Sequence, residues 1–267
     1  MMTLVAFHSS FNLLGIFIFL PFLGVFARFL ERRFLNKDHL IAEYIKNVPT
    51  SVPEAAIVAL QQEVQHLVRR IFVMNLSMLK LKNESFHKES FYHLSPTDQY
   101  DNLKELEGEI AEFQLKIQQG ALESDTAATL AQLTDAIRYA MSSAKGIKDI
   151  AHNITDFSKS ANDDLNGLLQ LIKQNQADYY NALLMVFQSQ HPQHYFEKLS
   201  DLKKLSKVNY SQFLEKAYAI ILSKRLTDIE ISTLFNVNRE IHSSNKSLVL
   251  GIKDLLLEQV QAKDFEF

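Results

Sequence analysis

Cysteine is absent from this chain of 267 residues. The absence excludes a disulfide framework, a thiolate metal site and a cysteine nucleophile, so any metal ion would need histidine and carboxylate ligands. Glycine and proline are also scarce, with 7 and 5 residues respectively. Three of the glycines, Gly108, Gly167 and Gly251, fall inside segments of helical periodicity. This scarcity predicts long helices joined by few loops and disfavours an all-β fold or a glycine-rich nucleotide-binding fold.

Excess positive charge is confined to the first 37 residues, which carry four basic side chains and one acidic one, a net charge of +3. Because the whole chain carries −3, residues 38–267 carry −6. A nucleic-acid partner would require clustered basic charge. The sequence therefore predicts that nucleic acid is not a partner.

A long apolar run, "FNLLGIFIFLPFLGVFARFLERRF", extends from Phe11 to Phe34. Residues 1–27 contain one titratable side chain, that of His8. As a helix they would span roughly 40 Å, enough to cross a hydrocarbon core of about 30 Å. No basic residue precedes the run and no small-residue cleavage site follows it, which disfavours a secretory signal peptide. We therefore predict a transmembrane helix with a basic flank over residues 1–34, followed by a linker over residues 35–50.

The two ends of this segment differ in polarity. Basic residues follow it and none precedes it, so the positive-inside rule predicts an outside N-terminus and a cytoplasmic remainder. Pro21 would lie in mid-membrane, and His8, Ser9, Ser10 and Asn12 form a polar cluster near the outer end. Such residues usually face neighbouring helices or a water-filled cavity, which predicts that the helix packs against others. A position at the headgroup level remains an equal alternative for the polar cluster.

Six segments of helical periodicity follow. Signals for a helix start lie at Ser51, Ser95-Pro96, Asn162 and Thr227. Ser51 and Glu54 have the spacing of a capping box, and Pro53 falls in the first turn. The lengths of the six segments follow the order medium, medium, long, and then the same again. We therefore expect an all-α fold in which residues 51–160 and residues 161–267 each form a three-helix bundle.

Three stretches are similar to parts of bacterial sodium/phosphate symporters of the Na/Pi-cotransporter type, which carry a PhoU-like helical domain after their last membrane helix. They are "AFHSSFNLLGIFIFLPFLGVFARFLERR", "AKGIKDIAHNI" and "ISTLFNVNREIHSSNKSLVLGIKDLL". In order and spacing the chain resembles the C-terminal portion of such a transporter. The resemblance implies an inner-membrane protein whose cytoplasmic PhoU-like tandem regulates the inward movement of phosphate with sodium.

The resemblance also implies a membrane half that this sequence does not contain. The family's Gln-Ser-Ser signature and its other membrane segments are not in this sequence, and a single helix cannot enclose an ion path. The membrane half is therefore expected from the same or a separate polypeptide, and the lipid bilayer is the other expected partner. The oligomeric state stays open, with a homodimer as one option. Sodium and phosphate would be transported ions, and no cofactor is expected.

PhoU-like proteins can bind metal through Glu-x-x-x-Asp motifs, whose spacing places two carboxylates on one helix face. Here the first motif retains Asp149 but has Lys145 in place of the Glu, and the second has Asn238 and His242. A lysine at the ligand position disfavours a cation, so we expect no metal, with Asp149 and His242 as the remaining candidate ligands. The preferred interpretation is a polar seam between the third and sixth helical segments. Its predicted members are Lys145, Asp149, Asn153, Asn238, Arg239, His242 and Asn245.

No catalytic motif stands out, so we expect that the protein is not an enzyme. The acidic cluster of Glu105, Glu107, Glu109 and Glu112 is interpreted as a solvated helix face. Two functions remain open: the closing helix and regulatory domain of a sodium-dependent phosphate symporter, and a membrane-tethered helical signalling or scaffold protein resembling chemoreceptor cytoplasmic regions.

Overall fold

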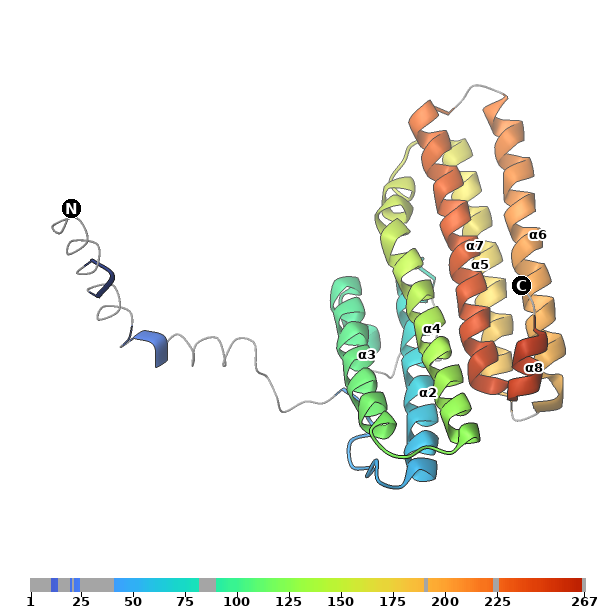
Figure 1. The fold of residues 1–267 in the computed structure, drawn as a ribbon. Helices are drawn as coiled ribbons and strands as arrows, with labels where there is room; N and C mark the ends of the chain where they lie inside the picture. The colour runs from blue at the N-terminus through green and yellow to red at the C-terminus, as the bar shows by residue number, and fades with distance from the viewer. Residues whose placement is uncertain are drawn as a thin grey trace, which may run out of the picture. The chain divides into compact units, whose positions relative to one another are not determined.

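Helices account for all the regular secondary structure that the computed structural model describes, in residues 11–13, 20, 22–24, 41–81, 90–189, 192–222 and 226–265 (Figure 1). The all-α prediction is therefore confirmed for these residues. The longer α-helices are α2 (Pro53–Met78), α3 (Pro96–Gln118), α4 (Ser124–Phe157), α5 (Asp163–Phe187), α6 (Tyr195–Ile221) and α7 (Asp228–Leu256). The short elements are η2 (Ser90–His93), η3 (Pro192–His194) and α8 (Gln259–Asp264).

Three of the predicted helix starts are confirmed by their capping hydrogen bonds. The Ser95 side chain accepts a hydrogen bond from the backbone N–H of Asp98, and Asn162 accepts from two N–H groups at the start of α5. Thr227 and Glu230 form the predicted capping box at the start of α7. These side chains satisfy backbone donors that the first turn of a helix leaves unpaired.

The predicted capping box at Ser51 is wrong. Helix α2 begins at Pro53, Val52 occupies the N-cap position, and no side chain caps the helix. The fixed φ angle of proline suits the first helical position. Ser51 therefore lies one residue too early to cap this turn.

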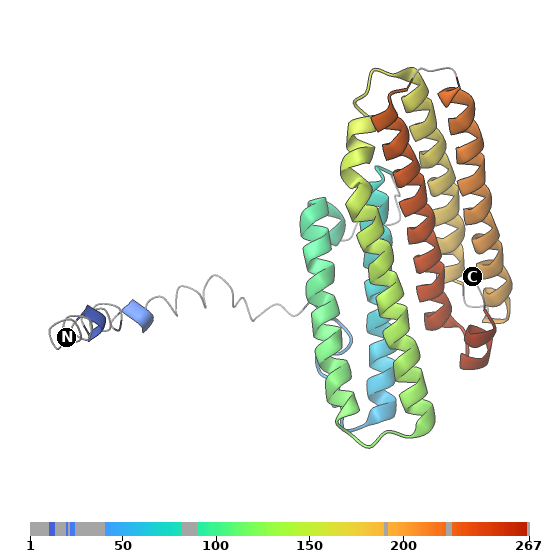
Figure 2. The same cartoon turned by 45° about the horizontal axis from the view of Figure 1, so that its top comes forward.

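The helices fall into two groups that meet along α4 and α7 (Figures 1 and 2). In the first group α2 packs against both α3 and α4, and in the second α6 packs against both α5 and α7. The most extensive interface joins α4 to α7, which are the longest helices of their groups, with 34 and 29 residues. The two run antiparallel, since Ser143 contacts Ser244 while Gln132 contacts Leu257.

Small residues let α4 and α7 approach closely. A Cβ atom added to Gly251 would lie 3.0 Å from the carbonyl oxygen of Ala136 and 3.1 Å from the backbone nitrogen of Ala140. A Cβ on Gly146 would lie 3.6 Å from the Cβ of Ser244. Contact between the two helices at Gly251 is therefore backbone against backbone, with no space for a side chain.

One continuous hydrophobic core extends from Ala42 to Phe265 and includes buried side chains from both groups. Residues 41–265 accordingly form a single compact unit, separate from residues 1–40. The two groups of helices thus share one core.

Helix α8 was not predicted, and it is bound to both groups, through α4 and through α7. Gln132 on α4 donates hydrogen bonds to the carbonyl oxygens of Asp254 and Leu257, and Gln259 donates one to Thr129. Lys253 on α7 donates a hydrogen bond to the carbonyl oxygen of Ala262. The short helix is held through polar contacts as well as through its buried Ala262.

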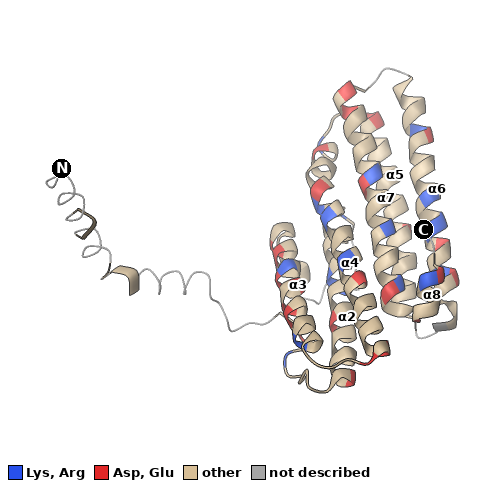
Figure 3. Cartoon of the chain, viewed as in Figure 1, with Lys and Arg blue, Asp and Glu red and all other residues tan. Residues whose placement is uncertain are grey.

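Most of the predicted membrane segment, residues 1–34, lies outside the described residues. Residues 11–13, 20 and 22–24 are helical, and their side chains are exposed. Among the residues that the structure describes, no helix combines the length and the apolar character needed to cross a bilayer. In the helical unit, acidic and basic residues both occur on each of α3, α4, α6 and α7 (Figure 3).

We predict that Gly251→Ala destabilises the protein by about 1–3 kcal/mol, because the added methyl group would force α4 and α7 apart. Gly108→Ala is the matched control, since a Cβ there meets nothing within 4 Å. It should stabilise α3 by about 0.5–1 kcal/mol. Urea denaturation followed by circular dichroism measures both. Equal effects of the two substitutions would contradict the close approach of α4 and α7.

Candidate functional site

The segment that leads into the helical unit is held by two carboxylates, one from α3 and one from α2. On α3, Glu109 accepts hydrogen bonds from the backbone N–H groups of Ile41 and Ala42, at 2.9 and 2.7 Å. Both of its carboxylate oxygens are used in this way. The first two residues of the segment are therefore fixed to α3 through their backbone.

The second carboxylate belongs to Glu63 on α2, which is fully buried. Its Oε2 atom accepts hydrogen bonds from the N–H groups of Glu43, Tyr44 and Ile45, at 2.9, 2.6 and 3.3 Å. Its Oε1 atom lies 2.8 Å from Nδ1 of His66. We call residues 41–45 together with Glu63 and Glu109 the junction clamp, because residues 41–45 join the helical unit to the chain that precedes it.

Hydrogen bonding keeps Glu63 ionised despite its burial. Burial by itself would raise the pKa of this carboxyl group, but the hydrogen bond with His66 and those from the backbone of Tyr44 and Glu43 outweigh it. The positive charge of a protonated His66 acts in the same direction. The pKa of Glu63 is consequently lowered from its usual 4.5, and the carboxylate is charged near neutral pH.

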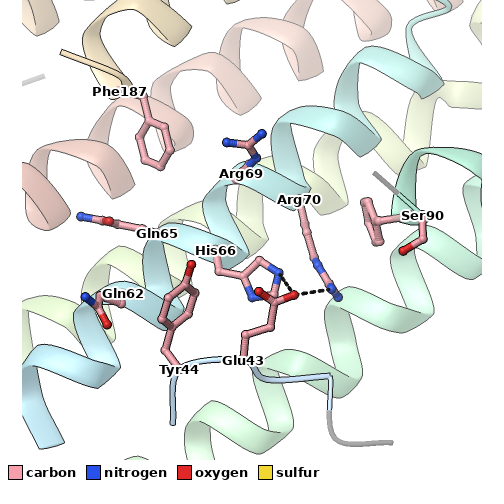
Figure 4. A pocket seen from close by; sticks show the side chains of 10 residues that line it. Glu43, Tyr44, Gln62, Gln65, His66, Arg69, Arg70, Ser90 and Phe187 are labelled. Atoms are coloured by element: carbon pink, nitrogen blue, oxygen red, sulfur yellow. Dashed lines mark ion pairs between the residues drawn. The ribbon is translucent and has the colours of Figure 1, made fainter. Parts of the chain in front are cut away.

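A cavity of about 530 Å³ opens beside the clamp, lined by residues from the segment, α2, η2 and the end of α5 (Figure 4). We call it the junction pocket. The Glu43 carboxylate enters it and lies 3.5 Å from Nε2 of His66 and 3.9 Å from Nη2 of Arg70. Arg69, Gln62 and Gln65 also line the cavity from α2, and Phe187 lines it from α5. The junction pocket thus combines cationic and neutral hydrogen-bond donors with aromatic surface.

The buried side-chain hydrogen bonds between α4 and α7 come from two serines that the sequence interpretation did not include. The Oγ atoms of Ser143 and Ser244 lie 2.8 Å apart, and Ser244 also donates to the carbonyl oxygen of Ser143, at 3.0 Å. Asn75 on α2 donates to Ser143 and to the hydroxyl group of Tyr180 on α5, at 3.2 and 2.9 Å. This buried network connects α2, α4, α5 and α7, and so joins the two groups of helices.

The predicted polar seam is corrected by the structure in part. Lys145, Asp149 and Arg239 have exposed side chains and Asn153 is half-buried. On α4 the buried positions Ala140, Ala144 and Ile147 occupy the packed face, so Lys145 and Asp149 project from the opposite one. The other three predicted residues, Asn238, His242 and Asn245, line a small cavity among α5, α6 and α7.

That cavity has a volume of about 10 Å³ and carries three buried polar atoms without a hydrogen-bond partner. They are Oε1 of Gln176, Oδ1 of Asn245 and Nδ2 of Asn209. Two are acceptors and one is a donor. A water-sized group that donates two hydrogen bonds and accepts one would satisfy all three. All three atoms belong to neutral amide groups, and the cavity is too small for a ligand larger than water.

His242 has the chemistry of a neutral hydrogen-bonding group at this position. Burial lowers its pKa, and the charges of Lys246 and Lys207 act in the same direction against the raising effect of Ser206. Its Nδ1 atom lies 3.0 Å from Oγ of Ser206. The other candidate metal ligand, Asp149, is exposed on α4. Across the described ranges, no three or more histidine, aspartate or glutamate side chains form a group that could hold a metal ion.

Most candidate residues of the predicted membrane segment have no described position. His8, Ser9, Ser10 and Pro21 lie outside the described residues. Asn12 is described, and it is helical and exposed. The proposed role of these residues in packing against other membrane helices stays a prediction.

Sequence reasoning missed both carboxylates of the junction clamp. Glu63 lies between Leu60, Val64 and Leu67 on the apolar stripe of α2, and an acidic residue at such a position was a signal that could have been read. Glu109 was assigned to a solvated acidic face, which is wrong for this residue. It is half-buried and binds the backbone of residues 41 and 42.

Comparison with known proteins gives no relative. The chain matches no protein-family model, and no curated protein or solved structure is significantly similar to it.

We predict that Glu63→Ala lowers the free energy of unfolding by about 2–4 kcal/mol, because it leaves the N–H groups of residues 43–45 without their acceptor. Those amides should also exchange hydrogen faster. Because the folded-state pKa of Glu63 is lowered, its ionisation stabilises the fold fully above about pH 4.5. This contribution is lost as the pH falls through the lowered pKa.

Denaturation of the wild type and the variant between pH 3 and 7, with hydrogen exchange at neutral pH, checks this prediction. Glu215→Ala is the control, because Glu215 is exposed on α6. A stability difference between wild type and Glu63→Ala that did not shrink in acid would show that the charge of Glu63 has no part in it.

Proposed function

We propose that this chain supplies the last membrane helix and a cytoplasmic PhoU-like regulatory domain of a sodium-dependent phosphate symporter. Residues 1–34 would cross the inner membrane with the N-terminus outside, and residues 51–267 would form the regulatory tandem. The all-helical compact unit and its two groups of three long helices are compatible with this proposal. So is the resemblance of the three quoted stretches to the Na/Pi-cotransporter family.

The observation that carries the proposal is the junction clamp. Five consecutive residues at the start of the helical unit make five backbone hydrogen bonds to Glu63 and Glu109. The side chains of Ala42 and Ile45 are buried in the same core. A regulatory domain can act on a membrane segment only if a displacement of one moves the other, and the junction clamp would fix the end of such a connection that belongs to the helical unit.

The exposed apolar side chains of the N-terminal stretch also support the proposal. Phe11, Leu13, Leu20, Phe22 and Leu23 are each at least 58% exposed. A bilayer or neighbouring membrane helices would cover such side chains, whereas water disfavours them. The basic flank at residues 28–37 gives the proposed orientation.

The transport path itself would lie elsewhere. One helix cannot enclose an ion path, so the membrane half would come from the same polypeptide or from a separate one. In this arrangement the helical unit binds neither transported ion in the membrane. It would control transport through its attachment to the last helix.

The alternative is a membrane-tethered signalling or scaffold protein. A receptor-like stalk needs heptads that continue through a long rod, whereas the helices here end at residues 118, 157 and 187 and fold back antiparallel. The fold therefore argues against a stalk. A tethered scaffold without transport remains the competing function in the test below.

We expect sodium-dependent phosphate uptake in cells that express the complete locus, and its loss when the membrane half is deleted. The double variant Glu63→Ala, Glu109→Ala should change the rate of uptake at least severalfold while the protein stays in the membrane, because it releases residues 41–45 from the helical unit. Uptake of labelled phosphate with and without sodium, alongside membrane fractionation, measures both effects.

Glu215→Ala again serves as the control and should leave uptake unchanged. Phosphate uptake that is independent of sodium, or absent from the complete locus, would refute the transport function and favour the tethered scaffold. Uptake that is unaffected by the double variant would refute coupling through the junction clamp.

A further inference from the structure

The junction pocket has the size and the lining of a ligand site. Its volume of about 530 Å³ lies within the range of about 300–1,000 Å³ that is typical of small-molecule pockets. Gln62, Gln65, His66, Arg69 and Arg70 line it, and they recur at the spacing that places side chains on one face of a helix. One wall of the cavity is therefore a surface of hydrogen-bond donors, two of them permanently cationic.

Two of these donors are held in place by other residues. Arg70 donates a hydrogen bond to Oδ1 of Asn102 at 2.6 Å, and its guanidinium lies over the ring of Phe91, 5.2 Å from the centroid. His66 is fixed by Glu63, which contacts the ring nitrogen that faces away from Glu43. Donors that are already oriented lose little freedom when an anion binds, which favours affinity.

A carboxylate of the protein itself already lies next to these donors. Glu43 projects its carboxylate between His66 and Arg70 (Figure 4). The contacts are long, at 3.5 and 3.9 Å, and the side chain of Glu43 is 57% exposed. The side chains of His66 and Arg70 are only 11% and 15% exposed, so the donors belong to the protein surface that the pocket shelters, whereas the carboxylate itself is in contact with water. Long contacts from a water-exposed carboxylate contribute little to stability, so another anion can displace it at small cost.

The pocket is larger than a carboxylate or an inorganic oxyanion requires. Tyr44 and Phe187 line it together with the donors. An anionic group that is bound by His66, Arg69 and Arg70 would leave space beside these rings for an apolar or aromatic body.

We propose that the junction pocket binds a small organic anion, with a carboxylate or phosphate group on an apolar or aromatic body, and that this anion takes the place of Glu43 at His66 and Arg70. Glu43 belongs to the junction clamp, and its N–H group is bound to Glu63. Binding would therefore loosen residues 43–45. Binding of the anion does not depend on the proposed function. An effect of binding on the membrane segment rests on the proposed function.

The test is calorimetric titration of the purified full-length chain in detergent with phenyl phosphate. Saturable binding of one equivalent is expected, and phenol, which lacks the anionic group, should not bind. Arg70→Gln and Arg69→Gln should each weaken binding about tenfold or more. The second variant is included because the Arg69 side chain is exposed, and replacing an exposed side chain usually changes stability little. Lys216→Gln, an exposed change of the same charge on α6, should have no effect.

Glu43→Gln removes the competing carboxylate and should tighten binding about fivefold. Glu215→Gln is the matched control and should leave the affinity unchanged. In hydrogen exchange, saturating phenyl phosphate should accelerate the amides of residues 43–45 in the wild type. Binding without a change in exchange, or without a gain in Glu43→Gln, would overturn the displacement of Glu43.

Two further probes define the ligand. Inorganic phosphate should bind at least tenfold more weakly than phenyl phosphate, and equal binding would overturn the role of an organic body. Dihexanoyl phosphatidic acid presents the same anionic group on a lipid. Tighter binding of this lipid would assign the site to a headgroup, and tighter binding of phenyl phosphate would assign it to a soluble anion.

Absence of binding by both phenyl phosphate and the lipid, or binding that is unchanged in both arginine variants, would refute the site. None of these measurements depends on transport, so their failure is distinguishable from failure of the proposed function.

Discussion

The close approach of α4 to α7 is the contact on which the rest of the structure depends. It is possible because Gly251 presents no side chain to the backbone at Ala136 and Ala140. The same approach brings Ser143 within hydrogen-bonding distance of Ser244. Each group of three helices has an apolar face that would otherwise meet water, and this interface buries both faces in one core. Neither group is complete without the other.

The junction clamp shows how a buried charge can organise a segment that has no regular secondary structure. Backbone N–H groups outside a helix or sheet need acceptors, and a carboxylate can satisfy several at once. Glu63 does so for three residues, and the buried charge is in turn stabilised by these donors and by His66. The segment and the carboxylate therefore stabilise each other. The same arrangement aligns His66 toward the junction pocket, so the attachment of the segment and the chemistry of the pocket have a common origin.

Local signals in the sequence predicted the local structure well. The starts of α3, α5 and α7 follow from side chains that cap the next turn, and the long α4 follows from its unbroken apolar periodicity. The start of α2 was misjudged because Pro53, rather than Ser51, determines where that helix begins. The sites were harder to predict, since they depend on which distant helices meet. Helical spacing alone does not distinguish Lys145, which is exposed, from Ser143, which is buried. The partners of Glu109 lie 67 and 68 residues away.

The distance in sequence between α4 and α7 also determines when the core can form. Ser143 and Ser244 are 101 residues apart, and Gln132 and Leu257 are 125 apart. Most helical proteins fold quickly because their contacts are local, whereas pairings of this range form slowly. During synthesis α2, α3 and α4 are complete while α7 is still missing. The face of α4 that later packs against Gly251 is then exposed to solvent and to other nascent chains. The protein is therefore most prone to aggregation before α7 leaves the ribosome.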